Sequence, residues 1–292
     1  MISDATFRIG SSHTICEDYA RAGVSIFGDP IAIVSDGCSS SPDTDIGSRI
    51  LVLEILKNSF LTEDLEAVTT SLQHTRAPSL CIEECDNIRL YKYSMNSAKQ
   101  SICAMGLDEK CLDATILILM ATQNKIISTC WGDGIIVQKF KSGTISARII
   151  SYPNGYPSYP SYILEPLREH NRKHMNKITK KTITRTPDGK TYINDIPTYD
   201  TPLDITVTHF DEHNNDPLVA MAIFSDGIQS FTRTNNEETS KTKKPVDFIE
   251  LLPKLMSFSG KGEFTRRRLN GLIRKEPELS HYDDLSIGAI II

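Results

Sequence analysis

Four short acidic motifs stand where apolar, strand-like stretches end, and these residues are the best suited to chemistry. Two of them share a local form, because an apolar run leads directly into Ser-Asp-Gly at Ser35 and again at Ser225. A strand holds such a carboxylate rigidly at its end, and the glycine lets the backbone turn and lets its carbonyl approach a ligand. The four motifs are Glu17-Asp18, Asp36-Gly37, Asp226-Gly227 and Asp283-Asp284.

Taken singly, each Asp-Gly is better explained as an ordinary turn, because Asp-Gly is a common turn dipeptide. The set is harder to explain in that way. If the strands pack centrally, the carboxylates converge, and two unit charges ~4 Å apart repel by about 4 kcal/mol at an effective dielectric of 20. Such a cluster needs cations. Oxygen ligands without neighbouring His or Cys suit Mg²⁺ or Mn²⁺ better than zinc.

The elements that must position these motifs follow from the spacing of apolar residues. Gly28-Asp29-Pro30 predicts a hairpin turn between two β-forming runs, and no internal repeat is visible. We predict helices from about 42, over 84–105, 246–258 and 264–274, and strands over 24–27, 31–35, 114–120, 125–130, 135–140, 144–150, 203–210, 218–225 and 285–292. This order predicts one α+β domain over residues 1–292.

Residues 152–201 differ from the rest, since they open with prolines and tyrosines and then become basic. Long irregular segments in a compact domain are usually lids or binding loops. We expect a flap-like insertion here that selects the substrate. Lys177, Lys180 and Lys181 would steer an anionic phosphoprotein toward the site. A solvated surface insertion is the alternative.

Composition excludes several classes of protein. The 292 residues carry a formal net charge of −5, which gives no reason to expect nucleic acid as a partner. The longest apolar stretch, Ala114 to Ala121, is far shorter than the roughly 20 residues that a membrane helix needs, and no signal peptide is evident. Seven cysteines without paired spacing indicate reduced thiols. We therefore expect a cytoplasmic protein with no membrane contact.

In order and content, the motifs resemble those of the type 2C, metal-dependent (PPM) serine/threonine protein phosphatases, from about residue 9 to the C-terminus. The resemblance implies a four-layer α-β-β-α sandwich with two central, mainly antiparallel β-sheets, and suggests a divergent, bacterial-like member. Six motifs carry it: Glu17-Asp18, Val34-Ser-Asp36-Gly37, Asp113-Ala-Thr115, Trp131-Gly132-Asp133-Gly134, Phe224-Ser225-Asp226-Gly227 and Asp283-Asp284-Leu-Ser286.

The resemblance also implies roles for these residues. Asp36 would bridge two Mn²⁺ or Mg²⁺ ions with help from the Gly37 carbonyl, and Asp226 and Asp283 would complete one ion's shell. Glu17 and Asp18 would act through bound waters. Asp133 would help to hold a possible third ion. A water shared by the metals would then hydrolyse phosphoserine or phosphothreonine in a protein substrate, which implies a cognate serine/threonine kinase.

Three positions depart from the family pattern. His13 stands where many relatives place a phosphate-gripping Arg, Cys38 stands where they have His or Met, and Asp284 replaces an Asn. A protonated His13 still binds phosphate, but less strongly than a bidentate Arg. We expect His13 to join Asp36, Asp226 and Asp283 as a catalytic residue. The residues expected to contact the substrate are His13, Arg172, Lys173 and Lys177.

These departures keep a second function open, namely a catalytically weak phosphatase-fold module that binds or regulates a phosphoprotein. The clustered carboxylates argue against it, because a pure scaffold has no use for them. Hydrolysis of a small phosphorylated metabolite is a third possibility.

Overall fold

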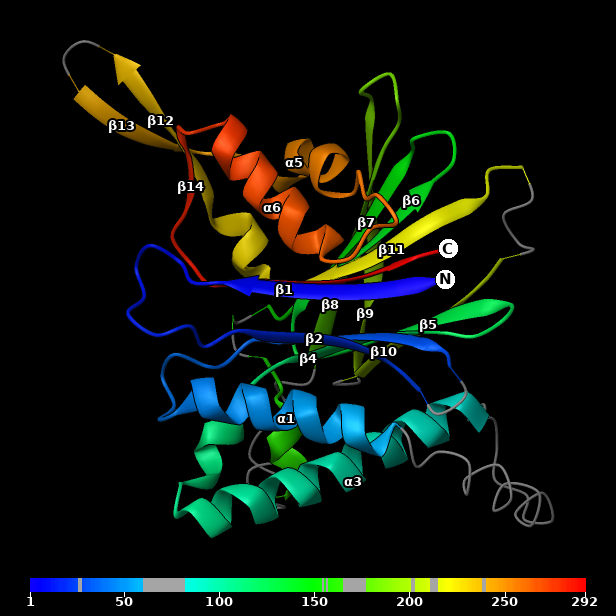
Figure 1. Cartoon of the computed structure of the whole chain (residues 1–292), viewed down its shortest axis with the longest axis vertical. Helices are drawn as coiled ribbons and strands as arrows, with labels where there is room; N and C mark the ends of the chain where they lie inside the picture. Colours follow the sequence, from blue (N-terminus) through cyan, green and yellow to red (C-terminus); the bar gives the residue numbers. More distant parts are fainter. Residues whose placement is uncertain are drawn as a thin grey trace.

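Two antiparallel β-sheets stacked face to face form the centre of the protein (Figure 1). The computed structural model describes residues 1–25, 28–59, 82–153, 155, 157–164, 177–200, 203–210, 215–237 and 240–292. The larger sheet has seven strands in the order β1-β15-β11-β6-β7-β8-β9. They are β1 (Ile2–Arg8), β15 (Leu285–Ile291), β11 (Leu218–Phe224), β6 (Gly134–Phe140), β7 (Ile145–Ser151), β8 (Lys177–Arg185) and β9 (Thr191–Asp200).

The second sheet has five strands in the order β10-β5-β4-β3-β2, and every neighbouring pair in it is antiparallel. Apolar side chains of both sheets meet between them, among them Val34, Leu117, Met221 and Ile223. The strands are β10 (Leu203–His209), β5 (Lys125–Trp131), β4 (Ile116–Ala121), β3 (Pro30–Ser35) and β2 (Tyr19–Val24).

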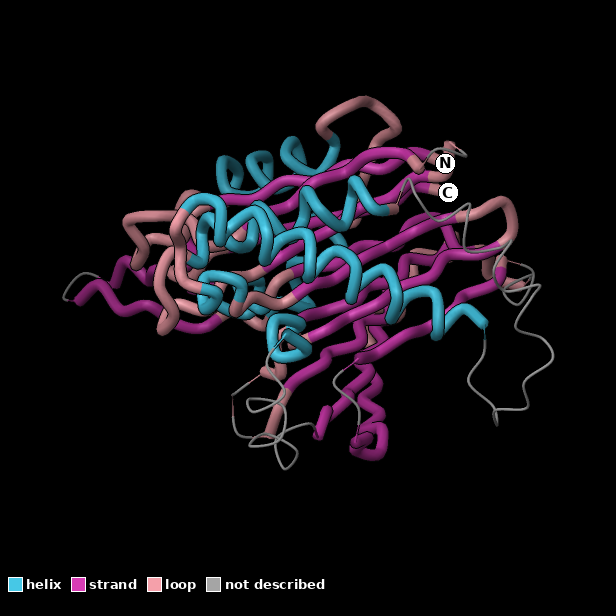
Figure 2. The backbone as a smooth tube through the Cα atoms, turned by 90° about the horizontal axis from the view of Figure 1, so that it is seen from below, coloured by secondary structure: helices cyan, strands magenta, loops and turns pink. Residues whose placement is uncertain are grey.

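Helices cover the outer face of each sheet, so the expected four-layer sandwich is confirmed (Figure 1). Helices α1 (Thr44–Asn58) and α3 (Ile82–Met105) pack on the five-stranded sheet, and Figure 2 shows them lying across its strands. Helices α5 (Phe248–Leu255) and α6 (Phe264–Lys275) pack on the other sheet. Among the described residues, we find no helix that combines the length and the apolar character needed to cross a membrane.

The position of β3 between two hydrophobic cores explains why its sequence is apolar throughout. Its side chains alternate between two hydrophobic cores, because Ile31 and Ile33 face the helices while Ala32 and Val34 face the other sheet. All four are fully buried. The hairpin with β2 is present, although β2 ends at Val24, where the sequence predicted the strand to begin.

A third, three-stranded sheet lies beside the sandwich, in the order β13-β12-β14. Its hairpin of β12 and β13 projects from the body of the molecule (Figure 1). It was not predicted from the sequence. The strands are β12 (Phe231–Glu237), β13 (Ser240–Pro245) and β14 (Leu279–His281).

The prediction of a long irregular segment is wrong for residues 177–200. These residues form the antiparallel pair β8 and β9, which extends the seven-stranded sheet. Its turn is closed by Gly189, whose φ of 86° suits glycine. Lysines and β-branched residues are mixed along β8 without a regular alternation, and this irregular pattern concealed the strand. Before it, the chain runs through the 3₁₀ helix η2 (Pro160–Leu164).

Candidate active site

Two facing strands of the central sheets deliver the core of the site. Asp36 directly follows β3 of one sheet, and Asp226 begins the 3₁₀ helix η4 (Asp226–Ser230) that follows β11 of the other. Their side chains meet, and the Asp36 carboxyl donates a hydrogen bond to Asp226. The two Ser-Asp-Gly motifs that stand far apart in the sequence are therefore neighbours in space.

The backbone around Asp36 is held on both sides. The Asp36 N–H donates to Oγ1 of Thr115 at 3.2 Å, and the Thr115 N–H donates to the Asp36 carbonyl at 2.8 Å. Gly37 is tightly enclosed, since a Cβ there would lie 2.9 Å from Cβ of Thr44 and 3.0 Å from the Glu17 carbonyl oxygen. A side chain at this position would push the loop away from Asp36, which accounts for the glycine.

Asp18 and Asp133 add two more carboxyl groups. Burial, followed by the charges of Asp18, Asp226 and Asp133, raises the pKa of Asp36 well above its usual range. Burial is also the main cause that raises the pKa of Asp18 and of Asp133 to about 7. Four acidic groups therefore interact in one place, where low dielectric makes their negative charges costly.

Asp18 is almost fully buried, with 1% of its surface exposed. The Ser225 hydroxyl donates to its Oδ2 at 2.7 Å, and the Ser286 hydroxyl lies near enough to lower the pKa of this carboxyl. The other oxygen, Oδ1, has no partner in hydrogen-bonding geometry. Asp18 is thus a buried carboxyl with an unused acceptor.

Asp133 lies in the tight connection between β5 and β6. It is flanked by Gly132 and Gly134, whose φ values of 98° and 146° lie in the range that favours glycine. A Cβ on Gly132 would also lie 2.7 Å from Cγ2 of Thr115. The two glycines therefore let Asp133 approach the carboxyl cluster, where the charge of Asp226 adds to its raised pKa.

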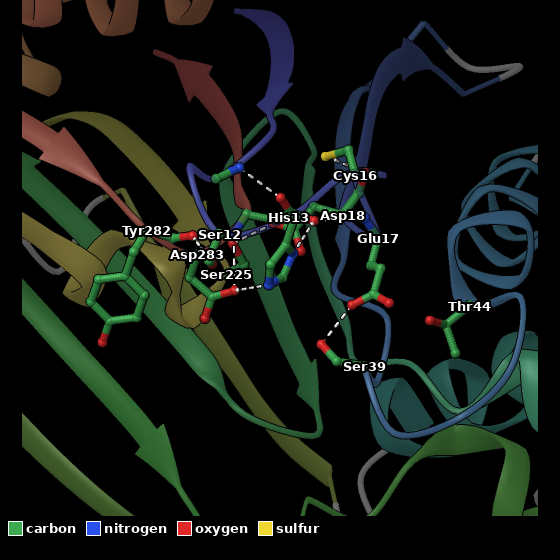
Figure 3. Close-up of polar contacts among 12 residues, drawn as sticks. Ser12, His13, Cys16, Glu17, Asp18, Ser39, Thr44, Ser225, Tyr282 and Asp283 are labelled. Carbon is green, nitrogen blue, oxygen red and sulfur yellow. Dashed lines mark hydrogen bonds and ion pairs between the residues drawn. The ribbon is translucent and has the colours of Figure 1, made fainter.

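His13 lies beside Asp283 (Figure 3), and it also contacts Asp284. Its Nδ1 lies 3.0 Å from Oδ2 of Asp284, and its Nε2 lies 3.5 Å from Oδ1 of Asp283. Burial lowers the pKa of His13, but the hydrogen bond and charge of Asp284, with the charges of Asp283 and Glu17, raise it overall. The expected phosphate-binding imidazole is therefore held by carboxylates.

Asp284 fastens the N-terminal loop to the last strand. Its Oδ1 accepts from the Gly10 N–H at 2.7 Å, and its Oδ2 accepts from the Glu17 N–H at 2.6 Å. Gly227 lies against the same residue, since a Cβ there would be 1.7 Å from the Asp284 carbonyl oxygen. The sequence did not predict this anchoring role.

Glu17 turns toward Ser39, whose hydroxyl donates to Oε2 at 2.6 Å (Figure 3). Asp283 is more open, with 39% of its side chain exposed. Its N–H donates to the Ser230 hydroxyl at 3.2 Å, which ties it to η4 and so to Asp226. Its charge also raises the pKa of Asp226.

The donor set fits hard divalent cations, because it consists of carboxylates at the point where the two sheets meet. As the side chains lie, however, no group of three or more His, Cys, Asp or Glu within the described residues could hold a metal ion.

The structure does not bring together all the basic residues that were expected to steer or contact the substrate. Arg172 and Lys173 lie outside the described residues, and Lys177 begins β8. The prediction that Lys180 steers the substrate is wrong. Its ammonium group pairs with the buried Asp204 of β10, which also lies 3.3 Å from Nε of Arg148. Lys180 therefore joins the two sheets and does not face a substrate.

Sequence reasoning missed Tyr159, whose side chain lies near enough to Cys38, the residue after Gly37, to help lower the pKa of that thiol. The tyrosines of this stretch were noted, but their composition alone did not single out one of them. Only the fold brings η2 next to the loop after β3.

Comparison with known proteins agrees with this geometry. The family model described as protein phosphatase 2C matches residues 9–273. Serine/threonine phosphatase Stp1 from Staphylococcus aureus has 11% sequence identity and a TM-score of 0.54, over 99% of this chain and 94% of that one. The S. agalactiae serine/threonine phosphatase has 12% identity and a TM-score of 0.51, over 99% and 98%.

A mutant form of a bacterial serine phosphatase has 9% identity and a TM-score of 0.55, over 99% of this chain and 97% of that one. A comparison with curated protein sequences gives no match. At such low identities the solved structures establish the fold, while the family model covers most of the sequence. The chain belongs to the protein phosphatase 2C family.

Proposed function

We propose that the protein removes phosphate from phosphoserine and phosphothreonine in protein substrates, with Mn²⁺ or Mg²⁺ as cofactor. The observation that carries this proposal is the hydrogen-bonded pair Asp36 and Asp226, surrounded by Asp18 and Asp133. Such a cluster of acids is costly to bury, so it is retained where cations bind. Family membership supports the same chemistry.

The residues divide the work in the following way. Asp36 and the Gly37 carbonyl, with Asp226 and Asp283, would hold two divalent ions. Asp133 would contribute to a third. Glu17 and Asp18 would orient waters, since Glu17 is already engaged by Ser39 and Asp18 by Ser225. When bound, the ions lower the pKa of a water and offset charge on the phosphoryl oxygens, so no protein nucleophile is needed.

His13 would bind the phosphate of the substrate. Its overall raised pKa favours the charged imidazolium, which attracts a phosphate oxygen. The protein partner would be a phosphoprotein made by a cognate serine/threonine kinase, in the cytoplasm. Lys177, Arg172 and Lys173 remain proposed contacts for that substrate.

The pairing of His13 with Asp283 and Asp284 favours a second candidate, the phosphatase-fold module that binds a phosphoprotein without turnover. A cation held by two acidic groups has less charge to offer a phosphate. Nothing comparable favours a small phosphorylated metabolite as substrate.

Phosphate release from a phosphoserine peptide separates these candidates. We expect release with Mn²⁺ and none after chelation. Asp36→Ala should abolish it while the circular dichroism spectrum stays native, and Cys38→Ala should keep most of it. Binding of the peptide without release, at any Mn²⁺ concentration, would favour the module. Loss of activity in Cys38→Ala alone would point to a cysteine-based mechanism.

A further inference from the structure

The hairpin of β12 and β13 is rooted beside the candidate active site. Strand β12 starts at Phe231, directly after η4, the 3₁₀ helix that begins with Asp226. It pairs with β14, which ends at His281, two residues before Asp283. The three-stranded sheet thus lies in the chain between two acidic motifs of the site. The hairpin projects from the end of the sandwich at which the loop between β1 and β2 lies (Figure 1).

Contacts at its base fix the hairpin to the site. The Asp283 N–H donates to the hydroxyl of Ser230, the last residue of η4, at 3.2 Å. Nδ1 of His281 lies 2.8 Å from the Asp283 carbonyl oxygen, and the His281 ring packs on that of Phe231 with centroids 5.3 Å apart. The base of the hairpin therefore has a defined position relative to Asp283.

One face of the hairpin is used for packing within the protein. Phe231 is fully buried in the core cluster that includes α5 and α6. Because successive strand residues point to opposite faces, Arg233 shares the face of Phe231, and so does Lys244, which lies directly opposite Arg233. Arg233 is paired with Glu276 at 2.7 Å and with Glu278 at 3.7 Å. The charge of Arg233 is therefore already balanced inside the protein.

The rest of the hairpin offers positive charge to solvent. Strand β13 has the sequence SKTKKP, and its Lys243 and Lys244 are both exposed. Lys243 lies opposite Thr234, on the face turned away from the core cluster. Neither lysine pairs with a carboxylate of the residues that the structure describes. The acidic Glu237 holds a register position at the far end of β12, opposite Ser240.

This local positive charge matters because the rest of the protein is acidic. The chain has a net charge of −5, and its candidate site is itself a cluster of carboxyl groups. A substrate with acidic residues is therefore repelled by most of the molecule, whereas the two lysines attract it. Thr234 is three residues beyond Phe231, so Lys243 lies about 10 Å from the base of the hairpin. An extended peptide covers that distance in about three residues.

We propose that the β12–β13 hairpin binds acidic residues that flank the phosphorylated serine or threonine of the protein substrate, through Lys243 and Lys244. This inference rests on the proposed phosphatase function and deepens it by naming the substrate class. The preferred substrates carry Asp or Glu about three to five positions from the phosphorylated residue. The hairpin takes no part in the chemistry, so its lysines act on KM and not on kcat.

The test compares two phosphoserine peptides that differ only at those flanking positions, with Asp and Glu in one and Asn and Gln in the other. With Mn²⁺ at low salt, the wild-type protein should have the higher kcat/KM on the acidic peptide. Lys243→Gln/Lys244→Gln should raise KM for that peptide about fivefold and leave kcat unchanged, because it removes two exposed ion pairs. Salt at about 0.5 M should reduce the wild-type preference in the same way, since it screens these pairs.

Lys57→Gln/Lys190→Gln is the matched control, because it removes the same charge from side chains that are 66% and 70% exposed on other elements. It should keep the preference for the acidic peptide. Equal use of both peptides by the wild-type protein, or the same loss in the control variant, would overturn the proposal while leaving the phosphatase function standing. Absence of Mn²⁺-dependent release from both peptides by the wild-type protein would instead reject the proposed function, and this inference with it.

Discussion

His13 and Asp284 lie against each other, with 3.0 Å between Nδ1 and Oδ2. These are two of the three positions at which the chain departs from the family pattern. His13 is a shorter cation than the Arg that it replaces, and Asp284 places a carboxylate where relatives have Asn. The two departures therefore form one ion pair. Asp284 also accepts the Gly10 and Glu17 N–H groups, which makes this corner a structural junction as well as part of the site.

The junction predicts a large loss of stability in Asp284→Ala. The substitution leaves the Gly10 and Glu17 N–H groups without acceptors, and each unsatisfied buried donor costs about 1–3 kcal/mol. We expect the free energy of unfolding in chelator to fall by about 3 kcal/mol, measured by urea denaturation. Asp283→Ala is the control, because that side chain is 39% exposed and its loss should matter little. Similar losses in both variants would contradict the role of Asp284.

The acidic cluster predicts that the metal-free protein is less stable at high pH. Burial raises the pKa of Asp18 and of Asp133 to about 7 in the folded chain, from 3.8 for an unperturbed carboxyl group. The folded state therefore binds more protons between these values, and stability falls as the pH rises through that range. In chelator, urea midpoints should be higher near about pH 5.5 than near about pH 8.

Two changes should reduce this pH dependence. Mn²⁺ should stabilise the protein more at the higher pH, because it binds the ionised carboxylates. Asp133→Asn should weaken the dependence in chelator, since it removes one of the raised groups. A metal-free protein that is equally stable across this range would show that the carboxyls do not interact as described.

A substitution of Asp133 should distinguish the proposed third metal site from the main pair of ions. Asp133→Ala should slow phosphate release while leaving the binding of the main pair of ions measurable by calorimetry. The reason is that Asp133 lies in a separate turn between β5 and β6, whereas Asp36 and Asp226 touch each other. If Asp133→Ala removed all Mn²⁺ binding, the residue would belong to the main pair.

The charged contact between the sheets predicts a structural role for Asp204. Its side chain is 3% exposed and pairs with Arg148 and Lys180. Asp204→Ala leaves two cations with no buried counter-charge, and breaking a buried pair costs about 3–5 kcal/mol. The control is Asp188→Ala, which removes an exposed partner of Lys190 and should not change the thermal midpoint measurably. An equal response of both variants would contradict this account.

The sequence predicted the parts of the fold in which one residue pattern dominates. The runs that end at Ser35 and Ser225 are apolar throughout because they are buried on both faces, so both strands and their terminal aspartates were found. Strand β1 was missed because its polar residues serve distant partners. Asp4 accepts from the Thr265 N–H at 2.8 Å, and the Ser3 hydroxyl donates to the Gly23 carbonyl at 2.8 Å.

The candidate site shows the same division. The acidic residues at strand ends were predictable, since each carries a local motif. Contacts made only by tertiary folding were not, such as Asp284 with Gly10 or Tyr159 with Cys38. Lys180 was predicted on the surface because a lysine is usually exposed. No local sequence pattern indicates that its partner, Asp204, is buried.

Anomalous X-ray scattering from a crystal grown with Mn²⁺ tests the central claim most directly. The account predicts two manganese peaks about 3.5–4 Å apart, the spacing of two-metal sites, between the carboxylates of Asp36 and Asp226. In that structure the hydrogen bond between the two side chains should be gone, because both carboxylates would be ionised and would bind the ions. A structure with no manganese at Asp36, and with the two carboxyls still hydrogen-bonded at saturating Mn²⁺, would contradict it.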